Sequence, residues 1–445
     1  MTGNWNDRRF TRRAALKAGA GAGAVLAAGG MGILRTGGSA RAAGNGYTGV
    51  KGEINLIATD GWISLPDPRN PTKYFPDGYA PNNRTTYLFG FRDVTSMVQA
   101  ARTATGNPQL IATDVAAIRA QKGKIQASAP LIYVDENDDV TISLSNLGFQ
   151  QRPDLTDGHT IHWHGFRNAL SLFDGIPEMS ISVPIGRTFP YFYKPHNPGT
   201  YIYHCHFEDV EHVQMGMTGV VFVRPAQNKA PIAGHPGPYA YNDGDGSTAY
   251  DREYALLITE WYLQSHWEDA HIQQPDWSEF KADAWFFNGR SYPDTLQASS
   301  GYDANGNPIG FADPRLAYQP ISALIKGNAG ERVLVRVVNI GYQQHSITLP
   351  GLPMKVVGKD ATLMRGRDGT DTSYLAETLD IGPGEATDVI ITMPEPSGSP
   401  YDVYPLFDRN YADGYLTKSG AHAGLRTELR AYPAGTLPAQ TTPNA

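Results

Sequence analysis

Residues 203–217 read YHCHFEDVEHVQMGM and contain the only cysteine of a 445-residue chain. Three imidazoles, one thiol and two thioethers lie within this short stretch. A single cysteine cannot close an intramolecular disulfide, so Cys205 is either an inert buried thiol or a ligand. The density of ligand-type side chains around it favours a metal site.

A second stretch, residues 159–165, reads HTIHWHG. Side chains of a β-strand alternate between its two faces. If this stretch is a strand, His162 and His164 share one face, and His159 points to the other.

The same alternation sorts the first stretch. His204 and His206 share a face, and Cys205 lies opposite. Pairing the two strands therefore predicts two sets of ligands. The first set combines two imidazoles, a thiolate and a weak axial thioether: His159, Cys205, His212 and Met217. Such a soft set selects copper of the blue, electron-transferring kind.

The second set has four imidazoles and no thiolate, enough for part of another copper centre. Its members are His162, His164, His204 and His206. Only Cys205 separates the two sets, with His204 and His206 as its covalent neighbours. Electrons could therefore pass between the two centres along the backbone.

The stretches HTIHWHG and HCHFEDVEHVQMGM resemble the copper signatures of the multicopper oxidases, a cupredoxin family that includes laccases. The resemblance implies type 1 copper on the first set. It also implies a trinuclear cluster, with His162 at the type 2 position and with type 3 positions at His164, His204 and His206. The catalytic roles it implies are electron uptake from a donor at His212 and transfer through Cys205. Met215 is a rival to Met217 as axial ligand, because the loop before His212 is longer than in most laccases.

Residues 1–43 are predicted to be a bacterial Tat export signal. A twin-arginine pattern at Arg12 and Arg13 precedes a weakly apolar Gly/Ala-rich run and a small-residue cleavage region. These residues hold seven Lys or Arg and one Asp, a net +6, so the rest of a chain of net charge −7 carries −13. A negative mature protein argues against nucleic-acid binding and favours neutral or cationic substrates. No later run is apolar and long enough for a membrane anchor.

The fold is predicted to be all-β, with two cupredoxin-like Greek-key sandwich domains and an irregular N-terminal insertion. Short strands with frequent turns support this, among them a half-buried strand at 140–145 and strong β patterns at 332–339 and 389–392. The predicted segments are domain 1 at 44–225, a linker at 226–251, domain 2 at 252–435 and a tail at 436–445.

Domain 2 lacks the His-x-His pairs that a complete trinuclear cluster takes from it in this family. Its best candidate ligand is His345, within QQHSIT. His266, His271 or His422 could join His345 in a reduced site, although the interpretation we favour for His266 and His271 is that they are ordinary surface or boundary histidines. Alternatively, two copies of domain 1 face each other in a homo-oligomer, since a twofold axis presents the same patch twice. In the third alternative only type 1 copper is bound.

The activity expected is oxidation of a small phenolic, amine or metal-ion donor, with dioxygen reduced at the histidine-bound copper cluster of an exported enzyme. The alternatives are a blue copper electron carrier and an enzyme similar to copper nitrite reductases. His162 and His206 argue against the latter, because the resemblance would require a carboxylate and a non-imidazole at these places. Three carboxylates at 208–211 could attract a cationic donor.

Overall fold

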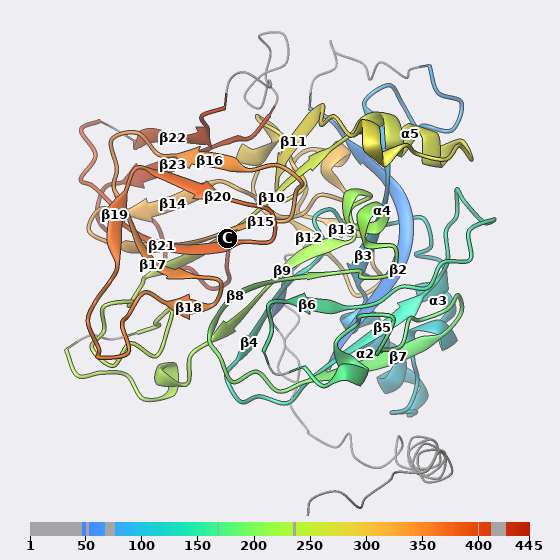
Figure 1. Cartoon of the computed structure of the whole chain (residues 1–445), viewed down its shortest axis with the longest axis horizontal. Coiled ribbons are helices and arrows are strands. Elements are labelled where there is room, and N and C mark those ends of the chain that lie inside the picture. The colour runs from blue at the N-terminus through green and yellow to red at the C-terminus, as the bar shows by residue number, and fades with distance from the viewer. Residues whose placement is uncertain are drawn as a thin grey trace, which may run out of the picture. The chain divides into compact units, whose positions relative to one another are not determined.

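The computed structural model describes most of the chain after the predicted export signal, which lies outside the described part (Figure 1). The described ranges are 47–49, 53–66, 76–167, 169–234, 237–398, 400–410 and 424–445.

Two sheets form the first half of the fold and share one core. One sheet has the order β3-β2-β5-β7 and the other β1-β4-β9-β8-β6. Their bounds are β1 Tyr47–Gly49, β2 Glu53–Ser64, β3 Thr85–Asp93, β4 Leu131–Asp135, β5 Val140–Asn146, β6 His162–His164, β7 Thr188–Tyr193, β8 Gly199–His204 and β9 Thr218–Arg224. Buried side chains of both sheets, Phe89 and Tyr203 among them, meet in a single cluster.

Two further large sheets and a small hairpin form the second half. The orders are β11-β10-β15-β21-β17-β18, with β19 beside β17, then β14-β23-β22-β16-β20, and β12-β13. The bounds are β10 Arg252–Trp261, β11 Ala284–Phe287, β12 Gly301–Tyr302, β13 Pro308–Ile309, β14 Ile325–Asn328, β15 Arg332–Asn339, β16 His345–Thr348, β17 Met354–Lys359, β18 Thr362–Leu363, β19 Tyr374–Ala376, β20 Thr378–Ile381, β21 Ala386–Thr392, β22 Asp402–Asp408 and β23 Arg426–Tyr432.

The halves repeat one topology. In each half, one strand of the first sheet pairs parallel with a second strand, and the second strand pairs antiparallel with a third. These strands are β2, β5 and β7 in the first half and β10, β15 and β21 in the second. The second sheet repeats in the same way, because β6-β8-β9-β4 and β16-β22-β23-β14 share their pairing directions. The predicted pair of cupredoxin-like sandwiches is confirmed, and the duplication that is faint in the sequence is plain in the strand order.

The expectation of an irregular N-terminal insertion is wrong for this region. β2 runs for 12 residues and pairs with both β3 and β5. It occupies the place that β10 holds in the second half, so it is an integral strand. The proline- and asparagine-rich stretch that suggested loops is confined to the connection between β2 and β3.

Helices are short and lie outside the sheets (Figure 1). The α-helices are α2 Thr95–Thr105, α3 Ala116–Arg119, α4 Asp209–Gln214 and α5 Leu263–Ala270. The 3-10 turns are η1 Ala112–Asp114, η2 Ser171–Phe173, η3 Ala226–Lys229, η4 Trp277–Glu279, η5 Asp294–Leu296 and η6 Pro314–Leu316. Within the described residues, no helix combines the length and apolarity that crossing a bilayer requires.

The two halves bury a common interface. Ile202 and Phe222 of the first half pack with Leu257 and Val338 of the second in one apolar cluster. This explains why all ten residues of β10 are buried, including polar ones. Strand β5 is also buried at all seven positions, so the half-buried strand predicted there is wrong: both of its faces are covered.

Candidate metal centre

Pairing of β6 with β8 puts imidazoles directly opposite each other. His162 faces His204 in the antiparallel register, and their ring centroids lie 5.2 Å apart. His164 lies two residues along the same face, with its ring 5.8 Å from that of His204. His206 follows just beyond β8, and its ring is 5.0 Å from His162. The structure therefore brings the four predicted imidazoles together.

Main-chain carbonyls fix the orientation of two of these rings. Nδ1 of His162 lies 2.6 Å from the carbonyl oxygen of Asp174, and Nδ1 of His204 lies 2.8 Å from that of Cys205. A carbonyl accepts only from an N–H, so both rings carry their proton on Nδ1. Their Nε2 lone pairs are left for a ligand.

The buried Nε2 of His204 has no hydrogen-bond partner among the described residues. Burial lowers the pKa of His204 to about 3, outweighing the bond to the Cys205 carbonyl. One nitrogen each of His162, His164 and His204 lies within 4.8 Å of the other two. Neutral imidazoles with converging lone pairs are a donor set that suits a transition metal such as copper.

The cysteine forms a second cluster on the opposite side. Sγ of Cys205 lies 3.2 Å from Nδ1 of His212 and 3.9 Å from Nδ1 of His159. All three residues are at most 1% exposed. Burial and the neighbouring His212 hold the pKa of His159 well below its usual range. A thiol between two imidazole nitrogens fits the soft ligand set of a blue copper site.

His212 lies on α4, so the predicted acidic loop is in fact a short helix. Burial alone would lower its pKa, but the neighbouring charges of Cys205 and Asp157 raise the pKa to about 10. Nε2 of His212 lies 3.7 Å from Asp157. Glu208 adds a second carboxylate within 4.8 Å of these groups. Its backbone adopts a left-handed conformation, with φ of 46°, at the start of the helix.

Thr160 links the two sets, a contact that the sequence reasoning missed. Its backbone N–H donates to Sγ of Cys205 at 3.4 Å, and its hydroxyl accepts from the backbone N–H of His206 at 2.8 Å. Asp157 and Asp174 were missed as well. The position of Asp157, two residues before His159, could have indicated that it lies near the thiol set. Asp174 could not be found in this way, because it acts mainly through its main-chain carbonyl, which any residue would supply.

Met217 is tied to the thiol set through its main chain. Its N–H donates to the carbonyl of His212 at 3.0 Å, and its carbonyl accepts from Cys205 at 3.1 Å. The carbonyl of Met215 instead accepts from Phe89 on β3. Both side chains are fully buried. The main chain of Met217 is therefore tied to His212 and Cys205, whereas the carbonyl of Met215 is tied to β3.

His345, the predicted ligand of the second half, contacts two buried carboxylates. Its Nδ1 lies 2.5 Å from Oδ2 of Asp408, and its Nε2 lies 3.2 Å from Oε2 of Glu260. Both ring nitrogens are therefore engaged by buried carboxylates. His266 and His271 also have other partners, the Tyr87 carbonyl and the Asp77 carboxylate, while His422 lies outside the described residues.

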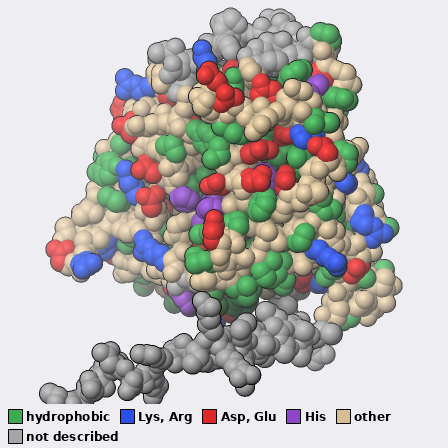
Figure 2. All heavy atoms as spheres, turned by 45° about the vertical axis from the view of Figure 1, so that its right-hand side comes forward, with side chains coloured by type: hydrophobic (Ala, Val, Ile, Leu, Met, Phe, Trp, Pro, Cys, Tyr) green, Lys and Arg blue, Asp and Glu red, His purple; other side chains and the backbone are tan. Residues whose placement is uncertain are grey.

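A pocket of about 320 Å³ opens beside the four-imidazole set at the boundary of the two halves. His164 and Arg167 line it from the first half, and Asp360 and Gly384 from the second. Gly384 has φ of +82°, and a Cβ there would lie 3.1 Å from Nε2 of His164. Figure 2 shows histidine side chains reaching the surface beside carboxylates.

Two multicopper oxidase family models match residues 123–228 and 252–418, which together make up more than half of the chain. The chain belongs to the multicopper oxidase family. Members of this family bind copper, and the donor sets described above fit that metal. In this multicopper oxidase, the residues that would hold copper form two sets. One set contains Cys205 with His159 and His212, and the other contains the four imidazoles on the opposite face of the strand.

Individual multicopper oxidases are distant. Copper resistance protein A of Escherichia coli is 25% identical over 323 residues, covering 66% of this chain and 46% of that protein. The chain spans less than half the length of that relative and of the similar laccases. A blue copper oxidase structure from Nitrosomonas europaea has a TM-score of 0.55 at 22% identity, covering 85% of both chains. A copper nitrite reductase from the same organism has a TM-score of 0.52 at 18% identity, covering 88% of this chain and 97% of that one. These structures share the fold.

Proposed function

We propose that this chain is a copper-dependent oxidoreductase that takes electrons from a small donor and uses them to reduce dioxygen. One observation carries the proposal. Cys205 belongs to a buried thiol-imidazole set, while its covalent neighbours His204 and His206 belong to a separate four-imidazole set. Copper bound in these two sets supplies reversible one-electron chemistry at the first and a site for dioxygen at the second.

The residues of the chain prepare both sets for the metal. The Thr160 N–H donates to Cys205 Sγ and so stabilises the thiolate over the thiol. Carbonyls of Asp174 and Cys205 hold the Nδ1 protons of His162 and His204, which keeps Nε2 directed at the metal position. Complete burial of Cys205 and His159 excludes water from the first set.

The donor is proposed to be a phenol, an aromatic amine or a reduced metal ion. Asp157 and Glu208, next to Nε2 of His212, favour a cationic one. The pocket beside His164 offers dioxygen a route to the second set. Export by the Tat route, and a periplasmic or extracellular location, remain part of this proposal.

The second half leaves the four-imidazole set incomplete within one chain. Thr348 lies opposite Phe407 where His162 lies opposite His204 in the first half, and neither side chain is a usual copper ligand. A homo-oligomer in which another copy adds its own imidazoles would complete the cluster. The same observation favours a second candidate function, a blue copper electron carrier with one copper.

Copper content of the copper-reconstituted mature protein tests the proposal. A value clearly above two per chain, with dioxygen uptake on a phenolic donor, supports the oxidase. A value near one, lost in Cys205→Ala, supports the electron carrier. No bound copper and no blue absorption would contradict both.

A further inference from the structure

His212 has no exposed surface, although the proposed function requires electrons to reach its set of ligands. The present inference rests on that proposed function. Its starting point is a continuous series of aromatic rings that connects His212 with the surface on the side of β2 and β3.

Three rings lead from His212 to the solvent on the side of β2 and β3. The ring centroid of Phe89 lies 5.7 Å from that of His212, in an edge-to-face arrangement. Tyr87 lies 5.7 Å beyond Phe89, and Trp62 lies 5.4 Å beyond Tyr87. Phe89 and Tyr87 are buried, whereas Trp62 is half-buried and therefore accessible to a donor.

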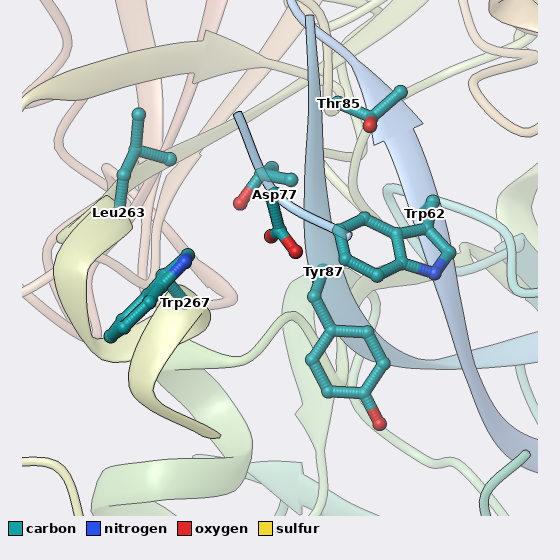
Figure 3. Close-up of a pocket in the computed structure, with 7 residues that line it drawn as sticks. Trp62, Asp77, Thr85, Tyr87, Leu263 and Trp267 are labelled. Atoms are coloured by element: carbon teal, nitrogen blue, oxygen red, sulfur yellow. The ribbon is translucent and has the colours of Figure 1, made fainter. Parts of the chain in front are cut away.

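Trp62 and Tyr87 line a small surface pocket (Figure 3). They come from the neighbouring strands β2 and β3, and Trp267 of α5 faces them across it. The pocket has a volume of about 20 Å³, room for a water-sized molecule but not for an aromatic donor. A donor that docks on this side would touch Trp62 from outside, and its electron would move along the rings to His212.

Tyr87, like Tyr241 and Tyr250, donates to a buried carboxylate, but the carboxylates of those two tyrosines are paired with Arg336. The Tyr87 hydroxyl points away from the pocket and donates to Oδ2 of Asp60 at 2.9 Å. Asp60 is 1% exposed, and no lysine or arginine of the described chain forms an ion pair with it. Tyr193, equally buried, donates to the carbonyl of Ile161, which cannot take up a proton.

We propose that Tyr87 and Trp62 relay single electrons from a donor at the surface to the metal set at His212. With copper held at the His212 set, Tyr87 would pass one electron towards it, and the phenolic proton of Tyr87 would move to the Asp60 carboxylate. A neutral phenoxyl radical and a carboxylic acid result. Trp62 then returns one electron to Tyr87, Asp60 returns the proton, and the donor, an aromatic amine or a reduced metal ion, returns one electron to Trp62. The net change is one electron moved from donor to acceptor, with no proton gained or lost by the chain.

The relay can be tested first in the copper-free protein. Hexachloroiridate(IV) serves as a one-electron oxidant, and freeze-quench EPR detects the tyrosyl radical. A buried radical outlasts those of exposed tyrosines, so the long-lived signal should fall to less than about half in Tyr87→Phe and in Trp62→Phe. Tyr193→Phe is the matched control: its ring stacks on Trp163 at 4.3 Å, and its loss should leave the signal unchanged.

The second measurement uses the copper-loaded protein and anaerobic stopped-flow bleaching of its blue absorption by hexaammineruthenium(II). Reduction should slow about tenfold in Tyr87→Phe and in Trp62→Phe but not in Tyr193→Phe. Wild-type EPR signals and wild-type reduction rates in both relay variants would overturn the relay. If no blue absorption forms, the proposed function fails, and the copper-free EPR result still decides whether Trp62 and Tyr87 exchange electrons.

Discussion

His345 and Asp408 form a buried ion pair at the place in the second half that His159 and Cys205 occupy in the first. Matching contacts establish the equivalence: His159 pairs with Val183 as His345 pairs with Ile381, and an asparagine of the preceding strand, Asn146 or Asn339, donates to the carbonyl of that partner. Thr348 then corresponds to His162, and their partners Phe407 and His204 are followed by Asp408 and Cys205. Glu260 holds the other nitrogen of His345. An ion pair thus lies where the first half has the proposed metal ligands His159 and Cys205.

This pair should make stability depend on pH. Burial opposes protonation of His345, but Asp408 and Glu260 outweigh it and raise the pKa to about 9, above the ordinary 6.5. A raised folded-state pKa contributes stability that is complete below pH 6.5 and is lost as the pH rises through 9. We compare the free energy of unfolding of wild type with that of His345→Gln. The advantage of wild type should be larger at pH 6 than at pH 10, by about 3 kcal/mol.

Urea unfolding at both pH values measures this difference. His196→Gln is the control, because the exposed His196 is bonded only to Asn137 among the described residues. A His345→Gln penalty that does not change between pH 6 and pH 10 would contradict the ion pair.

Cys205→Ser should remove one copper per chain and the blue absorption together, since only a thiolate gives this copper its charge-transfer band. The four-imidazole set lies on the other side of the strand and should keep its metal. Metal analysis and visible spectroscopy check both statements, with His196→Gln as control. Loss of all copper would mean that the two sets do not load independently.

Met217→Leu should raise the reduction potential of the blue copper and shift its absorption, because a weak axial thioether tunes both. Met215→Leu is matched in chemistry, burial and position, and should leave both properties unchanged. Redox titration decides between them. The reverse pattern would assign the axial position to Met215.

Asp157→Asn combined with Glu208→Gln should raise the KM for a cationic aromatic amine by about threefold to tenfold and leave the KM for a neutral phenol unchanged. The two carboxylates lie beside Nε2 of His212 and attract positive charge. Asp209→Asn, an exposed acid on the same helix, is the control. Equal effects on both donors would exclude electrostatic steering.

The period-two pattern of HTIHWHG was sufficient to predict the two ligand sets, because side-chain direction in a strand follows from position alone. The role of His345 could not be predicted this way. Its partner Asp408 lies 63 residues away, and Glu260 lies 85 residues away on another strand. β2 was also missed. Both of its faces are buried, so its sequence does not alternate between apolar and polar residues, and a proline-rich loop follows it. The domain boundaries and the copper ligands themselves remain predictions.

Thr160 has a further consequence for how such a protein can change. Its N–H contacts the sulfur of Cys205 and its hydroxyl contacts the N–H of His206, so a shift of Thr160 that retunes one set also displaces the other. Substitutions that adapt the first set to a new donor would therefore have to be accepted by the second at the same time. At the equivalent place in the second half, His345 is held by Asp408 and Glu260, so a substitution there would have to preserve an ion pair and not two sets of proposed ligands.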